Sequence, residues 1–207
     1  EKEYLLVEKN KSKIVSETGS YFSVLSKLRT ICEGNGFKEN AKVNKTLELI
    51  EKIAENDEKV IVFSYFLEPL SLLEEKLNKN NNSIQFKKII GDDSRGVRDN
   101  NIKEFKSDPN VTVLLASSKV ASEGLTLTEA NHVIFINKWW NPSSNHQARD
   151  RVVRIGQNKV VQIYSLFCTN TIEERVVKIL ENKEEVYKKV VDGMVDESFV
   201  TSLLEEE

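Results

Sequence analysis

The chain has 207 residues, of which 39% are hydrophobic and 30% are charged, and this composition excludes a largely disordered or low-complexity protein. Its formal net charge is −3, from 30 Lys and Arg against 33 Asp and Glu, so any surface that attracts a polyanion must be local. No apolar run approaches the ~20 residues of a membrane-spanning helix, and we expect no association with a membrane.

The first 40 residues precede the main pattern of the chain. Within them, the segment from Tyr21 to Cys32 places apolar residues three positions apart, which predicts one amphipathic helix that buries Phe22, Leu25, Leu28 and Ile31. Gly34, Gly36 and two Asn then favour turns, so a new unit is expected to begin near Ala41.

From Ala41 onward, helical and strand patterns alternate. The predicted helices cover residues 43–55, 67–77, 95–105 and 144–154, and the predicted strands cover residues 60–63, 84–90, 111–116, 132–136 and 160–167. Thr171 and Glu174 have capping-box spacing and predict a long helix to about Val191, which an acidic tail follows. Strands that alternate with helices predict an α/β fold, with a parallel sheet of five to seven strands and helices on both faces.

Two loops after predicted strands carry the unusual residues. Residues 117–128, with the sequence SSKVASEGLTLT, combine hydroxyls, Lys119 and Gly124, which suit a phosphate ligand but fit an ordinary turn equally well. Residues 138–159 carry a local net charge of +4. There Gln147, Arg151 and Arg154 have helical spacing and would present two guanidinium groups to a polyphosphate, although a solvated, ion-paired helix has the same spacing.

Several familiar chemistries are excluded by missing motifs. No G-x-x-x-x-G-K-[ST] sequence and no acidic DExH box occur, so the chain is not a complete NTPase. The two histidines, His132 and His146, and the two cysteines, Cys32 and Cys168, have no zinc-ligand spacing. We therefore predict no metal site, structural roles for the histidines and a reducing compartment for the thiols.

The chain resembles the C-terminal RecA-like lobe of SWI/SNF-type ATPases, superfamily-two motors that move on double-stranded DNA. The resemblance covers about residues 20 to 195, and its most specific parts are the WNP tripeptide at residues 140–142 and QARDRVVRIGQ at residues 147–157. It also includes KVIVFSYF, VLLASSKVASEGLTLTEANHVIFIN and TIEERVVKILENK. The chain departs from the family pattern at Ala121 and Ser122, where two glycines are common, and at Val153, where histidine is common.

This resemblance implies a RecA-like, three-layer α/β lobe without its own P-loop. Residues 1–40 would be a helical linker from the first lobe, residues 41–168 the second lobe, and residues 169–207 a brace helix with an acidic tail. Arg151 and Arg154 would be arginine fingers, with Gln147 beside them, and Gly124 and Leu125 would lie near the adenosine. The residues that the resemblance directs toward DNA are Gly91, Ser117, Ser118, Lys119 and Trp140.

The implied function is that of the C-terminal motor lobe of an ATP-dependent double-stranded DNA translocase. Its ligand would be ATP with Mg²⁺, bound mainly by a first lobe whose motifs this chain lacks. The chain alone would therefore be inactive as an ATPase. It is also expected to be monomeric. Its partners would be duplex DNA and the first lobe, in the cytoplasm of a prokaryote or the nucleus of a eukaryote. Two alternatives stay open: a non-catalytic RecA-like module that binds nucleic acid or protein, and the lobe of an RNA-directed helicase.

Overall fold

The computed structural model describes residues 2–34, 40–79, 84–118, 120, 126–137, 147–154 and 156–182, with side chains up to residue 177. The chain divides into two compact units: a helical unit and an α/β unit. The predicted boundaries at residues 40 and 168 remain predictions. Lys119, Gly124, Leu125, Trp140, Ser144 and His146 lie outside the described residues, as do residues 183–207.

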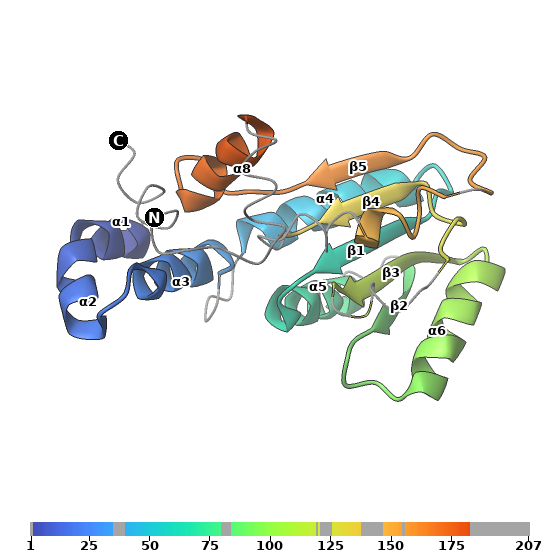
Figure 1. The fold of residues 1–207 in the computed structure, drawn as a ribbon. Helices are drawn as coiled ribbons and strands as arrows, with labels where there is room; N and C mark the ends of the chain where they lie inside the picture. Colours follow the sequence, from blue (N-terminus) through green and yellow to red (C-terminus); the bar gives the residue numbers. More distant parts are fainter. Residues whose placement is uncertain are drawn as a thin grey trace. The chain divides into compact units, whose positions relative to one another are not determined.

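A five-stranded parallel sheet forms the centre of the α/β unit, in the order β2-β3-β1-β4-β5 (Figure 1). Its strands are β1 (Val60–Ser64), β2 (Gln85–Ile89), β3 (Val111–Ser117), β4 (His132–Phe135) and β5 (Gln162–Ser165). Each strand lies within or close to its predicted range, and β5 is shorter than predicted. The predicted parallel sheet is confirmed.

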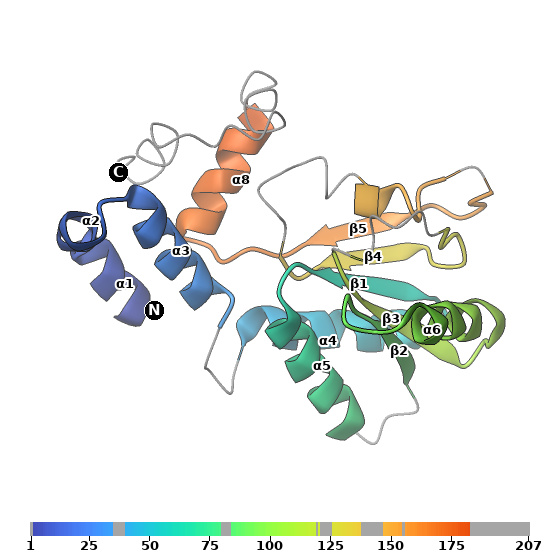
Figure 2. The ribbon, with the colours of Figure 1, turned by 60° about the horizontal axis from the view of Figure 1, so that its bottom comes forward.

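Helices cover both faces of this sheet, as the sequence predicts (Figure 2). They are α4 (Ala41–Ala54), α5 (Leu67–Lys79) and α6 (Arg95–Ser107). Side chains alternate between the two faces of a strand, and all five residues of β1 are buried. Val60 and Val62 pack with residues of α4 and α5, whereas Ile61 and Phe63 pack with Phe105 of α6.

The beginning of α4 shows how the local sequence fixes a helix end. The Asn40 side chain accepts hydrogen bonds from the backbone N–H groups of Lys42 and Val43, at 2.9 and 3.1 Å. These bonds satisfy two of the donors that a helix leaves unpaired at its first turn. The helical pattern predicted from Val43 therefore begins two residues earlier, at Ala41.

The helical unit contains α1 (Lys2–Lys9), α2 (Lys11–Thr18), α3 (Tyr21–Cys32) and α8 (Ile172–Asn182). The prediction of one helix before residue 40 was incomplete, because α1 and α2 are eight residues each and rich in charged residues. None of the helices in the described part of the chain is long and apolar enough to cross a membrane.

The buried face of α3 differs from the predicted one. Leu25 and Leu28 are buried as predicted, but Phe22 is 41% exposed, and Val24 and Cys32 are buried in its place. A strict three-residue spacing drifts around a helix of 3.6 residues per turn, so Phe22 falls away from the core-facing stripe, whereas Ile31 at its other end is partly buried and packs against the core cluster.

Glu58, just before β1, links the start of β1 to the start of β4, at the amino-terminal ends of the strands. Its carboxylate lies 2.6 Å from His132 Nε2 and accepts a hydrogen bond from Asn131 Nδ2 at 2.7 Å. The His132 contact, followed by the Asn131 hydrogen bond, lowers the pKa of Glu58 below its ordinary value. The His132 side chain is only 5% exposed, which agrees with the structural role predicted for it.

The Glu58→Gln variant is expected to lower the free energy of unfolding near neutral pH. Because the pKa is lower in the folded state, ionised Glu58 stabilises the fold above the unfolded-state value near 4.5, and this contribution is lost as the pH falls through the folded pKa. Urea unfolding from about pH 3 to 7 should therefore show a flatter acid-side dependence in the variant than in the parent. Glu55→Gln, at the exposed end of α4, is the control, and parallel profiles for parent and Glu58→Gln would contradict the prediction.

Candidate functional site

The carboxyl ends of the parallel strands place several of the singled-out segments at one edge of the sheet. Ser64 of β1 is in register with Ser117 of β3, and Phe63 is in register with Phe135 of β4. From β1 the chain passes to β2 on one side, whereas from β4 it passes to β5 on the other. Ligands of open α/β sheets bind where neighbouring connections diverge in this way.

Asn137, just after β4, holds this divergence point together. It is 2% exposed, and its Oδ1 accepts a hydrogen bond from Tyr65 N at 2.7 Å, while its Nδ2 donates to Ser64 Oγ at 3.0 Å. Ser64 Oγ in turn donates to Phe66 O at 2.7 Å. One buried amide therefore fixes the chain as it leaves β1 and β4, a role that the sequence analysis did not assign to it.

The residues predicted to face DNA differ in their exposure. Ser117 is 2% exposed, and its hydroxyl has no hydrogen-bond partner among the described residues. Ser118 is half-buried, and its N–H donates to Ser64 O at 2.8 Å. Gly91 is exposed, and a Cβ added there would meet nothing within 4 Å. Gly91 and Ser118 are thus on or near the surface, whereas Ser117 is in the interior.

The helix predicted from Ser144 to about Arg154 is shorter in the described part of the chain. Residues 147–149 form a helical turn, after which residues 150–154 continue as turns and bends. The Arg151 carbonyl accepts a hydrogen bond from Leu127 N at 2.8 Å, which commits it to a partner outside the segment. Gln147, Arg151 and Arg154 therefore do not share one helical face, and that part of the prediction was wrong.

Residues 126–130 and 151–157 are instead joined to each other by hydrogen bonds. Arg154 Nη1 donates to Thr126 Oγ1 at 3.0 Å. Gln157 Nε2 donates to Thr128 O at 3.0 Å and to Ala130 O at 2.7 Å. Together with the Leu127 to Arg151 bond, these contacts fix the position of the arginine segment against the end of the loop after β3. Spacing along the sequence gave no signal for pairs that lie about 28 residues apart.

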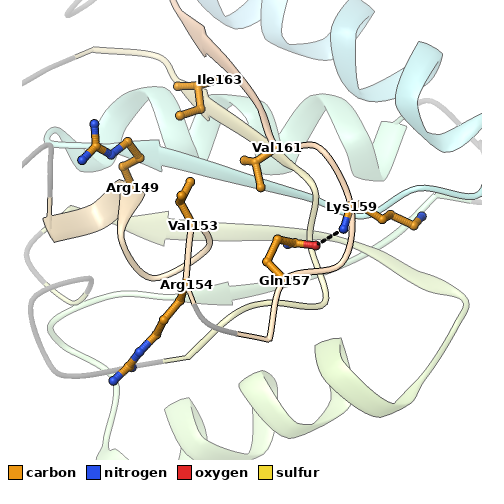
Figure 3. Close-up of a pocket in the computed structure, with 7 residues that line it drawn as sticks. All are labelled: Arg149, Val153, Arg154, Gln157, Lys159, Val161 and Ile163. Atoms are coloured by element: carbon orange, nitrogen blue, oxygen red, sulfur yellow. Dashed lines mark hydrogen bonds between the residues drawn. The ribbon is translucent and has the colours of Figure 1, made fainter.

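An open pocket of about 700 Å³ lies beside this segment (Figure 3). Its lining contains three cationic side chains, one amide and three aliphatic side chains: Arg149, Arg154, Lys159, Gln157, Val153, Val161 and Ile163. Arg149 is paired with Asp150 at 3.0 Å and Lys159 with Glu58 at 3.5 Å. Arg154 is exposed, and both of its neighbours in the sequence, Val153 and Ile155, are apolar.

The arrangement suits an anionic ligand. A guanidinium carries five N–H donors, and the Thr126 hydroxyl takes one donor nitrogen of Arg154 without neutralising its charge. Arg151 is half-buried and is not part of the pocket lining, so the two predicted arginine fingers differ in accessibility. Arg149 and Lys159 were counted in the local charge of +4, but the sequence analysis did not select them as site residues.

The Gln157→Ala variant is expected to loosen the arginine segment and to lower the free energy of unfolding by about 1 to 2 kcal/mol. The substitution removes both bonds to residues 128 and 130 and the acceptor for Lys159 N, at 2.9 Å. Urea unfolding measures the loss, and hydrogen exchange at Leu127 N should become faster. Asn158→Ala, at the exposed neighbouring residue, is the matched control. Equal stability of the two variants would show that Gln157 does not anchor the segment.

Residues 41–156 match the family described as the helicase conserved C-terminal domain. This match covers more than half of the chain, and the chain therefore belongs to that family. Solved structures that resemble the chain narrow the assignment within this family, because they are SWI2/SNF2 ATPase cores. The predicted resemblance to SWI/SNF-type motor lobes and the RecA-like fold are thereby confirmed.

Two of these structures are the C-terminal part of the Fun30 ATPase domain and the Sulfolobus solfataricus SWI2/SNF2 ATPase core in complex with double-stranded DNA. The first has a TM-score of 0.68 and 28% identity, and the match covers 81% of this chain and 52% of that one. The second has a TM-score of 0.74 and 26% identity, and the match covers 99% of this chain and 46% of that one.

The curated relatives include an uncharacterized ATP-dependent helicase of Mycoplasma genitalium, which is 38% identical over 193 residues. The chromatin-remodeling ATPase INO80 of Schizosaccharomyces pombe is 34% identical over 177 residues. These matches cover 89% and 84% of this chain, but the chain spans only 18% and 10% of the relatives' own lengths.

Proposed function

We propose that the chain is the second motor lobe of an ATP-dependent double-stranded DNA translocase. The observation that carries the proposal is the exposed Arg154 guanidinium, which the Thr126 hydroxyl holds at the rim of a cationic pocket in a SWI2/SNF2-type lobe. The similarity to a core whose structure contains double-stranded DNA supports DNA as the polynucleotide.

Arg154 is proposed to act as an arginine finger. Its side chain is exposed and charged, and it retains donors that can reach phosphoryl oxygens presented by another lobe. Such a group stabilises the charge that develops on a transferred phosphoryl group, which is the main contribution that protein residues make to this chemistry. Arg151, which is half-buried, is proposed as a second cation for the phosphate groups. Gln147 is exposed and is proposed to lie beside the two arginines at the nucleotide.

The nucleotide is proposed to be ATP with Mg²⁺, held mainly by a Walker-bearing first lobe. The described residues fit this division, because the pocket lining supplies cations for phosphate groups and contains no carboxylate for a metal ion. Gly124 and Leu125, proposed to lie near the adenosine, are outside the described residues. The chain alone is proposed to be inactive as an ATPase.

The DNA contacts are proposed to lie on the loops at the carboxyl edge of the sheet. Ser118 and Gly91 lie on or near the surface. Lys119 follows Ser118 in the loop after β3, and Trp140 belongs to the loop after β4. Backbone N–H groups, hydroxyls and a lysine bind phosphate oxygens without reading base sequence. Because Ser117 is buried, we propose that it shapes this loop and does not itself touch DNA.

The test measures ATP hydrolysis by a polypeptide that contains this lobe and a Walker-bearing first lobe. Hydrolysis should be stimulated most by duplex DNA, and less by single strands or structured RNA. Strongest stimulation by RNA would replace the proposal with an RNA-directed helicase. No hydrolysis with any polynucleotide would favour a non-catalytic module.

A further inference from the structure

The helical unit brings together the two cysteines of the chain. Cys32 is the last residue of α3, and Cys168 lies 136 positions later in the sequence, just before α8. Cys168 Sγ donates a hydrogen bond to Cys32 O at 3.6 Å, and neither cysteine is in a disulfide. Spacing along the sequence predicts no metal site from these residues, because only the fold makes them neighbours.

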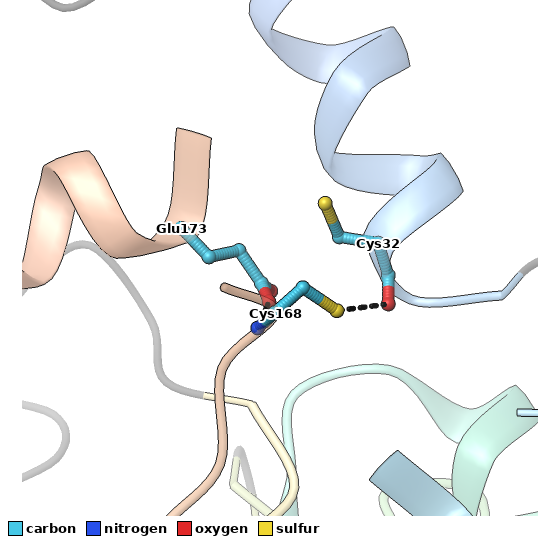
Figure 4. A group of neighbouring side chains, drawn as sticks. All are labelled: Cys32, Cys168 and Glu173. Atoms are coloured by element: carbon cyan, nitrogen blue, oxygen red, sulfur yellow. Dashed lines mark hydrogen bonds between the residues drawn. The ribbon is translucent and has the colours of Figure 1, made fainter. Parts of the chain in front are cut away.

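Glu173, in the first turn of α8, completes a cluster with these thiols (Figure 4). One ligand atom from each of the three residues lies within 4.8 Å of the others. Two thiolate ligands of tetrahedral zinc, each at about 2.3 Å from the metal, lie about 3.8 Å apart. Because 4.8 Å is the upper limit for any pair in the cluster, a contraction of at most about 1 Å would bring the two sulfurs to the spacing of zinc ligands.

The backbone around the cluster is already fixed by hydrogen bonds. Cys168 N donates to Glu173 Oε2 at 2.8 Å, and Thr171 Oγ1 donates to Cys168 O at 2.7 Å. Thr171 Oγ1 also accepts a hydrogen bond from Glu173 N at 3.2 Å. A carboxylate has lone pairs for more than one partner, so the bond from Cys168 N orients Glu173 and leaves capacity for a metal.

A cavity of about 450 Å³ gives access to the two thiols. It is lined by Tyr4, Leu5, Ile31, Cys32, Cys168 and residues 169–171. Zinc with three protein ligands keeps a fourth position for water, and a cavity that contains both cysteines provides an entry path and room for that water.

We propose that Cys32, Cys168 and Glu173 form a zinc site that ties the end of α3 to the start of α8. Two thiolates and one carboxylate suit Zn²⁺, whereas Mg²⁺ and Ca²⁺ require oxygen ligands. Each thiol loses its proton to solvent as its sulfur binds the metal, so Zn²⁺ uptake releases protons. Because metal binding displaces these protons, Zn²⁺ affinity should increase with pH.

The test titrates the metal-free 207-residue chain, reduced with a phosphine, with Co²⁺ and then with Zn²⁺. Co²⁺ should give thiolate-to-metal charge-transfer absorption and tetrahedral d–d bands with one ion per chain, and Zn²⁺ should displace it. Cys32→Ser and Cys168→Ser should each abolish the charge-transfer bands or weaken binding at least about 100-fold. Glu173→Gln should weaken binding by at least about 10-fold, because loss of a residue that merely supports a metal ligand already costs about 10- to 100-fold.

Glu174→Gln is the matched control, because Glu174 is the next residue and its carboxylate accepts from Asn170 N at 2.6 Å without joining the cluster. It should bind Co²⁺ as the parent does. Circular dichroism checks that each variant is folded, and the Glu173→Gln result keeps the test decisive if a cysteine variant is not. A reduced parent chain with two titratable thiols that takes up no Co²⁺, or equal uptake by all variants, would overturn the proposal. A chain that forms only a Cys32–Cys168 disulfide with oxidised glutathione, without metal uptake when reduced, would overturn it as well.

Discussion

Replacing Arg154 with Ala, in a polypeptide that joins this lobe to a Walker-bearing lobe, is expected to lower DNA-stimulated kcat by about 10³-fold or more. The reason is electrostatic: the exposed guanidinium would stabilise charge that develops on the transferred phosphoryl group, and the more enclosed Arg151 is not expected to replace it. Arg154 is exposed, and its contact with Thr126 Oγ1 is a single hydrogen bond at 3.0 Å. The free energy of unfolding should therefore change by no more than about 0.5 kcal/mol.

Two further variants separate the finger role from a general loss of charge. Arg95→Ala removes an arginine that is 90% exposed on α6, away from the pocket lining, and should leave kcat unchanged. Arg154→Lys keeps the positive charge but loses the planar fork of donors, so its kcat should lie between those of the parent and Arg154→Ala. Unaltered turnover in Arg154→Ala, measured with saturating duplex DNA, would remove Arg154 from the catalytic machinery.

The sheet was predictable because its signals are local. Val60 to Phe63 is a continuous apolar run, and Val111 to Ala116 is apolar except at Thr112; such runs are typical of strands that are buried on both faces. The segments that connect these strands carry apolar residues at helical spacing, and this alternation predicted a parallel sheet with helices on its two faces. The edge strand β5 extends less far than its sequence pattern, and Val160 before it is 84% exposed.

The arginine segment was predicted less accurately, because a tertiary contact replaced a local one. The spacing of Gln147, Arg151 and Arg154 fits a helix, but Leu127 N bonds the Arg151 carbonyl, and the segment continues as turns. The residue types were still informative, since Arg154 lines a pocket with Arg149 and Lys159, although Arg151 does not. Thr126, which accepts a hydrogen bond from Arg154, belongs to a distant segment, and a single sequence carries no signal for such a pairing.

The turn before α8 is a second place where the sequence pattern predicted the element but not all of its hydrogen-bond partners. The spacing of Thr171 and Glu174 predicted a capping box, and Thr171 Oγ1 does accept a hydrogen bond from a first-turn N–H, that of Glu173. The Glu174 side chain, however, bonds Asn170 N, one residue earlier than a capping box requires. Asn170 has a positive φ of 57°, a conformation that asparagine tolerates better than most residues. Capping spacing thus located the helix start correctly and its second hydrogen bond incorrectly.

The Asn137→Ala variant is expected to lower the free energy of unfolding by about 2 to 4 kcal/mol. Truncation removes the acceptor for Tyr65 N and the donor to Ser64 Oγ, and it does so at a position that is 2% exposed. A buried group that loses its partner costs about 1 to 3 kcal/mol, more than the bond itself contributes. Urea unfolding of the 207-residue chain measures the effect, and Asn78→Ala, on the exposed side of α5, should change stability by less than about 0.5 kcal/mol.

Asn137→Asp distinguishes the two hydrogen bonds, because aspartate keeps an acceptor for Tyr65 N but cannot donate to Ser64 Oγ when it is ionised. Burial of that charge without a cation should make the variant less stable near neutral pH than in mild acid, where the protonated carboxyl group can donate. A stability that does not change with pH, or a cost no larger than that of Asn78→Ala, would show that the divergence point between β1 and β4 does not depend on this amide. If the predicted pH dependence is found, this amide fixes the chain as it leaves β1 and β4. The loop after β4 contains Trp140, which is proposed to face DNA, so the loss of the amide should also reduce DNA-stimulated turnover.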